Sequence, residues 1–104
     1  MLDDMIDTGT TMITAAEKLR YSGAGRILVA ATHGWFSEDA AQTLNQAPID
    51  GIIVTDTLPI NQDVRAKLGD KLHVVSVAPM IGAALTNIVT GGSVSAIYSQ
   101  MASR

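Results

Sequence analysis

Three short runs of aliphatic residues, separated by segments of helical period, place the strongest constraint on how this chain can fold. The runs are Arg26–Thr32, Gly51–Thr55 and Leu72–Val77, and in each the apolar residues follow one another with little interruption. An unbroken apolar run of this length is typical of a strand in a parallel sheet, which is buried on both faces. We therefore expect parallel strands with helices covering both sides of the sheet.

The segments between these runs have the periodicity of helices. Helices are predicted over Thr10–Ser22, Ser37–Gln46 and Pro79–Thr90. Ser37 is a favourable N-cap for the second helix, since its hydroxyl can accept a hydrogen bond from a free backbone N–H. The third helix is expected to bury one apolar stripe, formed by Ile81, Leu85 and Ile88.

The resulting order of strands and helices predicts a single α/β domain over residues 1–104, with a mostly parallel sheet flanked by helices. Thr57–Gly69 is polar and contains a proline, so it is predicted to be a loop with a short helical turn at Asp63–Leu68. Only Met1-Leu2 precede the acidic segment that begins at Asp3. Because strands usually run about 5–6 residues, the fold is expected to be truncated at its first strand.

Composition excludes several classes of protein. With 47% hydrophobic and 16% charged residues among 104, the chain is not of the disordered type. It has no cysteine, which excludes a disulfide scaffold and a cysteine zinc site and is consistent with a cytoplasmic location. The net charge of −3 argues against nucleic acid as a partner. No apolar run approaches the roughly 20 residues of a membrane span, so no membrane partner is expected.

The most informative segment is Asp3–Thr11, which places three carboxylates and then Thr8-Gly9-Thr10-Thr11 directly before a helix. Backbone N–H groups at a helix start can bind phosphate, and a glycine allows close approach. Carboxylates such as Asp3 and Asp4 can hold Mg²⁺ through its water shell or accept hydrogen bonds from sugar hydroxyls. The segment therefore predicts a sugar-phosphate site. The alternative is that Asp7 or Thr8 only caps the helix and the two other aspartates are solvated.

The segment Asp3-Asp4-Met5-Ile6-Asp7-Thr8-Gly9, followed by Thr11, resembles the ribose-5-phosphate loop of type I phosphoribosyltransferase folds. More specifically, it resembles the loop of the ribose-phosphate pyrophosphokinase (PRPP synthetase) family. The resemblance continues over essentially the whole chain, in the order of that family's C-terminal domain. The further matching motifs are Ala31–Gly34 with Ser37, Val54–Ile60, Ser76–Pro79 and Ser93–Ser95.

The resemblance implies a transferase of nucleotide biosynthesis, a ribose-phosphate diphosphokinase that converts ATP and ribose 5-phosphate to AMP and PRPP. It also implies Mg²⁺ as the cofactor and a homo-oligomeric assembly. Asp3 and Asp4 would hold the ribose hydroxyls, directly or through the metal. The residues that would wrap the 5-phosphate are Asp7, Thr8, Gly9, Thr10 and Thr11. A regulatory phosphate or ADP site would involve Ser93, Ser95 and Tyr98.

The chain departs from the family in two ways. The pyrophosphokinases usually have glycine where this chain has Thr10. We expect phosphate binding to survive that change, with an altered loop conformation. The family's ATP-binding N-terminal half and its Lys/Arg loop have no counterpart here. No catalytic residue is therefore assigned in this chain. We expect it to be an inactive fragment by itself, with ATP bound only when the N-terminal half is present.

Two other interpretations remain open from the sequence. A receiver-type phospho-acceptor domain of signalling proteins also has an aspartate pair near its start and a strand that ends in an aspartate, as Asp56 does here before Pro59. Against it, no lysine follows Lys71, and a receiver has no use for a threonine-rich loop before its first helix. The second is a non-catalytic homologue that assembles with the active pyrophosphokinase.

Overall fold

The structure is a computed structural model that describes residues 1–102. Its strands are β1 (Leu2–Ile6), β2 (Leu28–Gly34), β3 (Gly51–Thr55) and β4 (Leu72–Val75). Its helices are α1 (Thr10–Tyr21), α2 (Ala40–Gln46), α3 (Gln62–Leu68), α4 (Ala78–Thr90) and α5 (Val94–Ala102), and a 3-10 turn covers Gly69–Lys71. The expected α/β architecture with a parallel sheet is confirmed.

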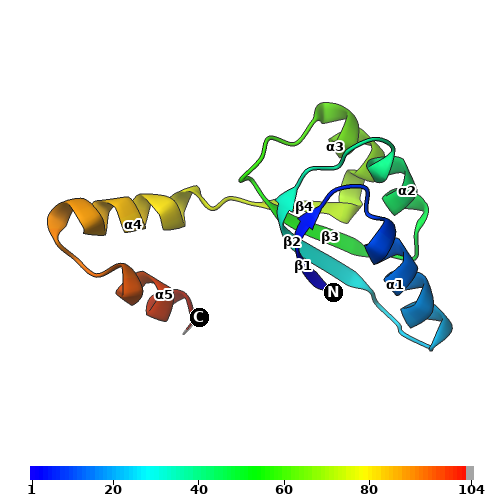
Figure 1. Cartoon of the computed structure of the whole chain (residues 1–104), viewed down its shortest axis with the longest axis horizontal. Helices are drawn as coiled ribbons and strands as arrows, with labels where there is room; N and C mark the ends of the chain where they lie inside the picture. The colour runs from blue at the N-terminus through cyan, green and yellow to red at the C-terminus, as the bar shows by residue number, and fades with distance from the viewer. Residues whose placement is uncertain (103–104) are drawn as a thin grey trace.

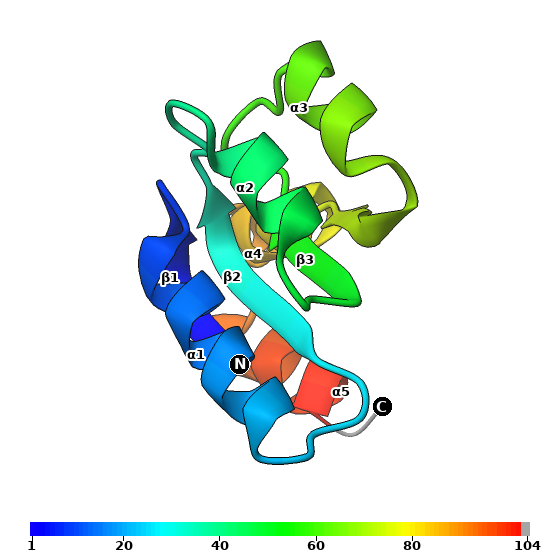
Figure 2. The ribbon, with the colours of Figure 1, turned by 90° about the vertical axis from the view of Figure 1, so that its right-hand side faces the viewer.

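The four strands form one parallel sheet in the order β1-β2-β3-β4. Val29 lies opposite Ile52 in the register of β2 and β3, and Val54 lies opposite Val74 in that of β3 and β4. Because each strand pairs with the next one along the chain, right-handed crossovers place α1, α2 and α3 on the same face of the sheet (Figures 1 and 2).

The hydrophobic core lies between these three helices and the sheet face that they cover. Its largest fully buried side chains are Ile6, Val29, Leu44, Ile52 and Val54. The remaining buried core residues are Met12, Ala16, Ile27, Ala31, Phe36, Ala40, Ala41, Ile49, Val64 and Leu68. The end of β1, where the polar segment of interest begins, is therefore anchored in this core by Ile6.

The other face of the sheet is not covered by any helix within residues 1–102, so the expectation of cover on both sides is wrong for this chain. The strands alternate in burial instead: Val29 is buried whereas Leu28 is exposed, and Val75 at the end of β4 is exposed too. The reason is topological. Helices reach both faces only where the strand order reverses, and hydrophobic runs in the sequence do not encode strand order.

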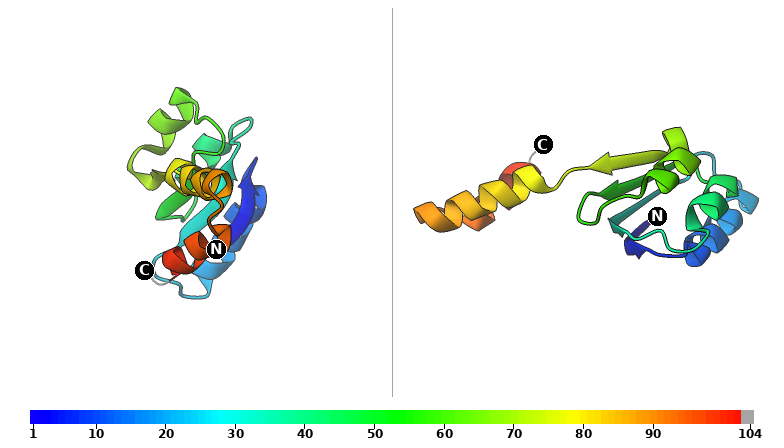
Figure 3. Two further views of the ribbon diagram at one scale, coloured as in Figure 1. Left: turned by 90° about the vertical axis from the view of Figure 1, so that its left-hand side faces the viewer. Right: turned by 90° about the horizontal axis from the view of Figure 1, so that it is seen from above.

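Helices α4 and α5 pack on each other and project away from the sheet (Figures 1 and 3). The Cα radius of gyration is consequently 16.3 Å, compared with about 13 Å for a compact chain of this length. The predicted buried stripe of α4 is therefore wrong: Ile81, Leu85 and Ile88 are 49–64% exposed. The periodicity correctly marked one apolar face of the helix, but it did not show that the face lacks a partner in this chain.

Several element boundaries also differ from those predicted. The first strand is Leu2–Ile6, so Asp3 and Asp4 lie within it rather than in the segment that follows it. The helical turn predicted at Asp63–Leu68 is confirmed as α3, which begins one residue earlier, and its Asn61 cap accepts a 2.7 Å hydrogen bond from the Asp63 N–H. Helix α5 follows Gly91-Gly92 in a segment for which no helix was predicted.

Candidate functional site

The polar segment forms a loop, Asp7–Gly9, that joins the carboxyl end of β1 to the start of α1 (Figure 1). Ligands of open α/β sheets bind outside this edge of the sheet. The loop encloses a cavity of about 130 Å³ that contains most of the predicted site. Its lining residues are Asp3, Met5, Ile6, Asp7, Thr8, Gly9, Thr10, Thr11 and Met12.

Gly9 fixes the geometry of this loop. It is the N-cap of α1 and has a φ of 80°, in the left-handed region that favours glycine. A Cβ atom placed on it would lie 3.1 Å from the Leu44 side chain of α2. The backbone therefore turns sharply here and packs directly on the core, which holds the start of α1 in one position.

The first turn of α1 has no side-chain cap among the described residues. Side chains do cap two other helices: Asn61 accepts from the Asp63 N–H at α3, and the Ser93 hydroxyl accepts from the Ala96 N–H at α5. Helices α2 and α4, like α1, have no side-chain cap within residues 1–102. Because the first N–H groups of a helix have no intrahelical acceptor, those of α1 remain available to an anion in the loop cavity.

Thr10, the residue expected to alter the loop conformation, is the first residue of α1. Only Phe36 and Glu38 among the described non-glycine residues have a positive φ, so Thr10 does not need the conformation that glycine alone adopts easily. The Thr10 hydroxyl lies 3.3 Å from that of Thr8. The side chain is therefore accommodated and adds a hydroxyl beside the cavity.

The structure separates the two neighbouring aspartates. Asp3 and Asp4 are consecutive residues of β1, so their side chains point to opposite faces of the strand. Asp3 lines the loop cavity, and its carboxylate accepts a 2.8 Å hydrogen bond from the Asp4 N–H; Asp4 is not among the cavity residues. Within residues 1–102 there is no group of three or more His, Cys, Asp or Glu side chains that could hold a metal ion.

Asp7 is held by a residue that was assigned another role. Ser37 was predicted to cap α2, but α2 begins at Ala40 and its N-cap is Asp39. The Ser37 hydroxyl instead donates a hydrogen bond to the Asp7 carboxylate, and the Ser37 N–H donates to the Asp7 carbonyl at 3.1 Å. The alternative in which Asp7 caps α1 is therefore wrong. The cap prediction failed because it considered only residues near Ser37 in the sequence. The hydrogen bond between Ser37 and Asp7 instead joins residues 30 positions apart.

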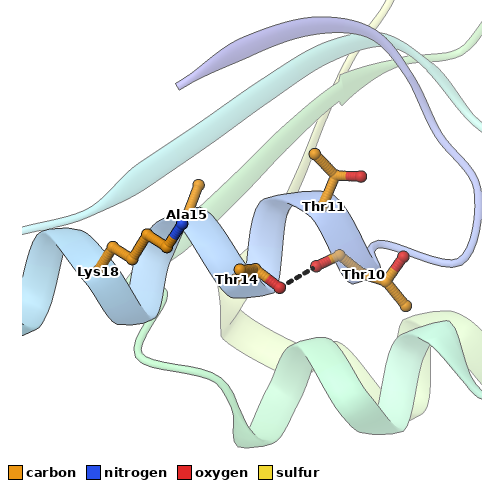
Figure 4. A pocket seen from close by; sticks show the side chains of 5 residues that line it. All are labelled: Thr10, Thr11, Thr14, Ala15 and Lys18. Atoms are coloured by element: carbon orange, nitrogen blue, oxygen red, sulfur yellow. Dashed lines mark hydrogen bonds between the residues drawn. The ribbon is translucent and has the colours of Figure 1, made fainter.

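Beside the loop, the exposed surface of α1 carries a second, shallower hollow of about 430 Å³ (Figure 4). Thr10, Thr11, Thr14, Ala15 and Lys18 line it. Residues 7 apart lie on one face of a helix, so the spacing from Thr11 to Lys18 could have identified this lysine from the sequence. Lys18 is the first basic side chain of the chain, and α1 also carries Arg20 in its last turn.

Asp56 has a structural role at the end of β3. Its carboxylate accepts a 2.9 Å hydrogen bond from the Val77 N–H and another from the Ser76 side chain. The Val77 N–H is the main reason that the pKa of Asp56 lies below its usual value. These contacts join the end of β3 to the residues just before α4, so the Asp56 carboxylate is engaged within the fold.

The residues assigned to a regulatory site lie on and just before α5, which projects away from β1 and α1 (Figure 1 and the right view of Figure 3). The Ser93 hydroxyl is engaged as the α5 cap, and the Ser95 carbonyl accepts a 3.3 Å hydrogen bond from the Ser99 hydroxyl. Tyr98 is exposed and lines an apolar cavity between α4 and α5. A phosphate or ADP site at Ser93, Ser95 and Tyr98 remains a prediction.

The fold and the loop together define a phosphoribosyl-type α/β domain. A family model described as the phosphoribosyl synthetase-associated domain matches residues 1–99. The chain belongs to this family.

Curated relatives are named ribose-phosphate pyrophosphokinase, as the resemblance predicted. The protein from Aquifex aeolicus is 44% identical over 99 residues, which are 95% of this chain and 30% of that protein. The protein from Mycobacterium tuberculosis is 41% identical over 98 residues, 94% of this chain and 29% of that protein. The chain thus spans about 30% of the length of the curated relatives that it matches.

The fold is also similar to a solved structure, the crystal structure of phosphoribosylpyrophosphate synthetase from Mycobacterium smegmatis. The TM-score is 0.81 and the sequences are 41% identical, with 88% of this chain and 30% of that chain covered. These comparisons favour the pyrophosphokinase family over the receiver interpretation. Within residues 1–102, no helix is long and apolar enough to cross a membrane.

Proposed function

We propose that this chain supplies the ribose-5-phosphate-binding part of a ribose-phosphate diphosphokinase. In that reaction the C1 hydroxyl oxygen of ribose 5-phosphate forms a bond to the β-phosphorus of ATP. The bond from the β-phosphorus to AMP breaks, and the hydroxyl proton is released. The single observation that carries the proposal is the uncapped first turn of α1, which opens into the loop cavity.

The 5-phosphate would bind against the start of α1. There the free N–H groups of Thr10, Thr11 and Met12 carry the positive end of the helix dipole. The hydroxyls of Thr8, Thr10 and Thr11 add donors around the same cavity, and Gly9 lets the backbone approach the anion closely. This arrangement offsets a phosphate charge without a basic residue inside the loop.

Asp3 and Asp4 would bind the ribose hydroxyls, directly or through Mg²⁺. Of these two, only Asp3 faces the loop cavity, so Mg²⁺ there would have one carboxylate of the pair and would take its other ligands from water and substrate phosphates. When bound, Mg²⁺ supplies positive charge that offsets the phosphates of ATP. The alternation of β1 suggests that Asp3 acts inside the loop cavity, whereas Asp4 acts from the other side of the strand.

ATP binding would require residues outside this chain, as we propose from the greater length of the relatives. Transfer of a phosphoryl group depends on cations around the transition state. The loop cavity contains no Lys or Arg among its lining residues. We therefore propose that the chain is inactive alone and acts in a homo-oligomer or larger assembly in the cytoplasm. A non-catalytic subunit of such an assembly is the second candidate, which the family's description as synthetase-associated favours.

Calorimetric titration with ribose 5-phosphate in the presence of Mg²⁺ tests this proposal. We expect binding, and we expect Thr11→Val to weaken it about tenfold because a hydroxyl donor to a charged group is lost. Thr86→Val is the matched control. Its hydroxyl bonds the Gly82 carbonyl on α4, far from the loop (Figure 1). Absence of binding at millimolar ligand would contradict the proposal, and binding of beryllofluoride in its place would favour a receiver domain.

A further inference from the structure

The turn that follows β2 folds over the start of the phosphate loop. Three consecutive N–H groups of this turn donate to the carbonyls of the last residue of β1 and the first residue of the loop. Those of Trp35 and Phe36 donate to the Ile6 carbonyl at 2.9 and 3.1 Å, and that of Ser37 donates to the Asp7 carbonyl at 3.1 Å. The entry to the loop is therefore fixed by a segment almost 30 positions further along the chain.

Ser37 holds Asp7 twice, through its backbone N–H and through its hydroxyl, which donates to the Asp7 carboxylate. A hydrogen bond to a charged acceptor is stronger than one between neutral groups. The contact takes up one oxygen of a carboxylate that lines the loop cavity. The position of the Asp7 side chain is thus set from outside the loop.

The turn itself is held under backbone strain. Phe36 and Glu38, on either side of Ser37, both have a φ of 51°, which non-glycine residues adopt at a cost. Phe36 is buried in the core, and a Cβ atom on Gly34 would lie only 2.6 Å from the Phe36 ring. Strain of this kind persists only where the surrounding contacts determine the conformation, and it often marks a functional site. Here those contacts place the Ser37 hydroxyl against Asp7.

Without the Ser37 hydroxyl, the Asp7 carboxylate would be free to accept other hydrogen bonds within the loop. An aspartate readily accepts hydrogen bonds from N–H groups two or three residues further along the chain. For Asp7 these are the N–H groups of Gly9 and Thr10, at the start of α1. A free Asp7 carboxylate would therefore occupy the N–H groups that an incoming phosphate needs, and it would repel the anion by its charge.

We propose that Ser37 is a positioning residue that keeps the Asp7 carboxylate away from the anion-binding N–H groups, so that the phosphate loop is open for its ligand. The inference rests on the proposed function, since it concerns binding of ribose 5-phosphate in the same loop. Ser37 does not touch the ligand and acts entirely through Asp7.

The test is the dissociation constant of ribose 5-phosphate, measured by calorimetry for the 104-residue chain and its variants. Ser37→Ala should raise Kd about tenfold, whereas Ser37→Thr, which keeps the hydroxyl, should stay within about twofold of wild type. Ser37→Ala combined with Asp7→Asn should recover part of the lost affinity, because the competing negative charge is removed. A merely structural role for Ser37 predicts no such recovery.

Ser76→Ala is the matched control. It removes another serine hydroxyl that bonds an aspartate, in this case Asp56 at the end of β3, and it should leave Kd unchanged. Near-wild-type affinity of Ser37→Ala, equal losses in Ser37→Ala and Ser37→Thr, or a further loss in the double variant would each overturn the inference while the proposed function stands. If wild-type protein fails to bind ribose 5-phosphate, the proposed function and the inference both fail.

Discussion

Replacement of Gly9 by alanine tests how tightly the phosphate loop is built onto the core. Gly9 adopts a φ of 80°, and an alanine in the left-handed region costs about 1–2 kcal/mol. The added Cβ would also meet three side-chain atoms of Leu44 at 3.1–3.2 Å. Leu44 is fully buried, so it can move only at the expense of core packing.

The two effects give an expected loss for Gly9→Ala of roughly 2–5 kcal/mol in the free energy of unfolding. About half comes from the backbone and the rest from overpacking, which typically costs about 1–3 kcal/mol. Urea unfolding followed by circular dichroism measures this loss. Because the start of α1 would shift, the variant should also bind ribose 5-phosphate more weakly.

Gly23→Ala, at the other end of α1, is the control for the backbone effect alone. Gly23 also has a positive φ, of 97°, but a Cβ on it would meet nothing within 4 Å. We expect Gly23→Ala to cost only about 1–2 kcal/mol. If Gly9→Ala destabilises the protein no more than Gly23→Ala does, then Gly9 is not packed against Leu44 and the explanation of the rigid loop is wrong.

Three further predictions follow from the fold and the charges. The Ile27 N–H and, less strongly, Arg20 lower the pKa of Asp50, so its contribution to stability is present above about pH 3.9. It is lost as the pH falls through the folded pKa, and Asp50→Asn should flatten this acid dependence in urea unfolding. The accessible surface of 6867 Å² is about 1300 Å² larger than that of a typical 10.9 kDa monomer, so the chain should self-associate. Light scattering measures this, and a sharp monomer mass at high concentration would contradict it. The chain alone should form no PRPP from ATP and ribose 5-phosphate, and turnover at ordinary enzyme rates in a coupled assay would show that no further chain is needed.

The sequence predicted three of the four strands, because each of these carries its own apolar run. Gly51–Thr55 was predicted with its observed bounds, β2 begins and ends two residues later than predicted, and β4 ends two residues earlier. The loop before α1 was also predicted, since the distinctive spacing of carboxylates, glycine and threonines is local. These features depend on neighbouring residues, which a sequence shows directly.

The errors concern contacts between distant residues. Nothing in the Ile81–Ile88 stripe of α4 shows that it faces solvent in this chain, because that depends on the strand order and on where the chain goes after β4. Ser37 has the local pattern of a helix cap, yet the fold brings Asp7 to its hydroxyl from 30 residues away. The separation of Asp3 from Asp4 appeared only once both were placed in a strand.

The most direct test of the central claim is where ribose 5-phosphate binds. In a ¹H–¹⁵N NMR titration of the labelled chain with Mg²⁺ present, the account predicts that the largest amide shifts fall on Thr8, Gly9, Thr10 and Thr11. Amides of α4 and α5 should move little, since these helices lie away from the loop (Figure 1). Shifts centred on Ser93–Tyr98, or no shifts at millimolar ligand, would contradict the assignment of the loop as the sugar-phosphate site.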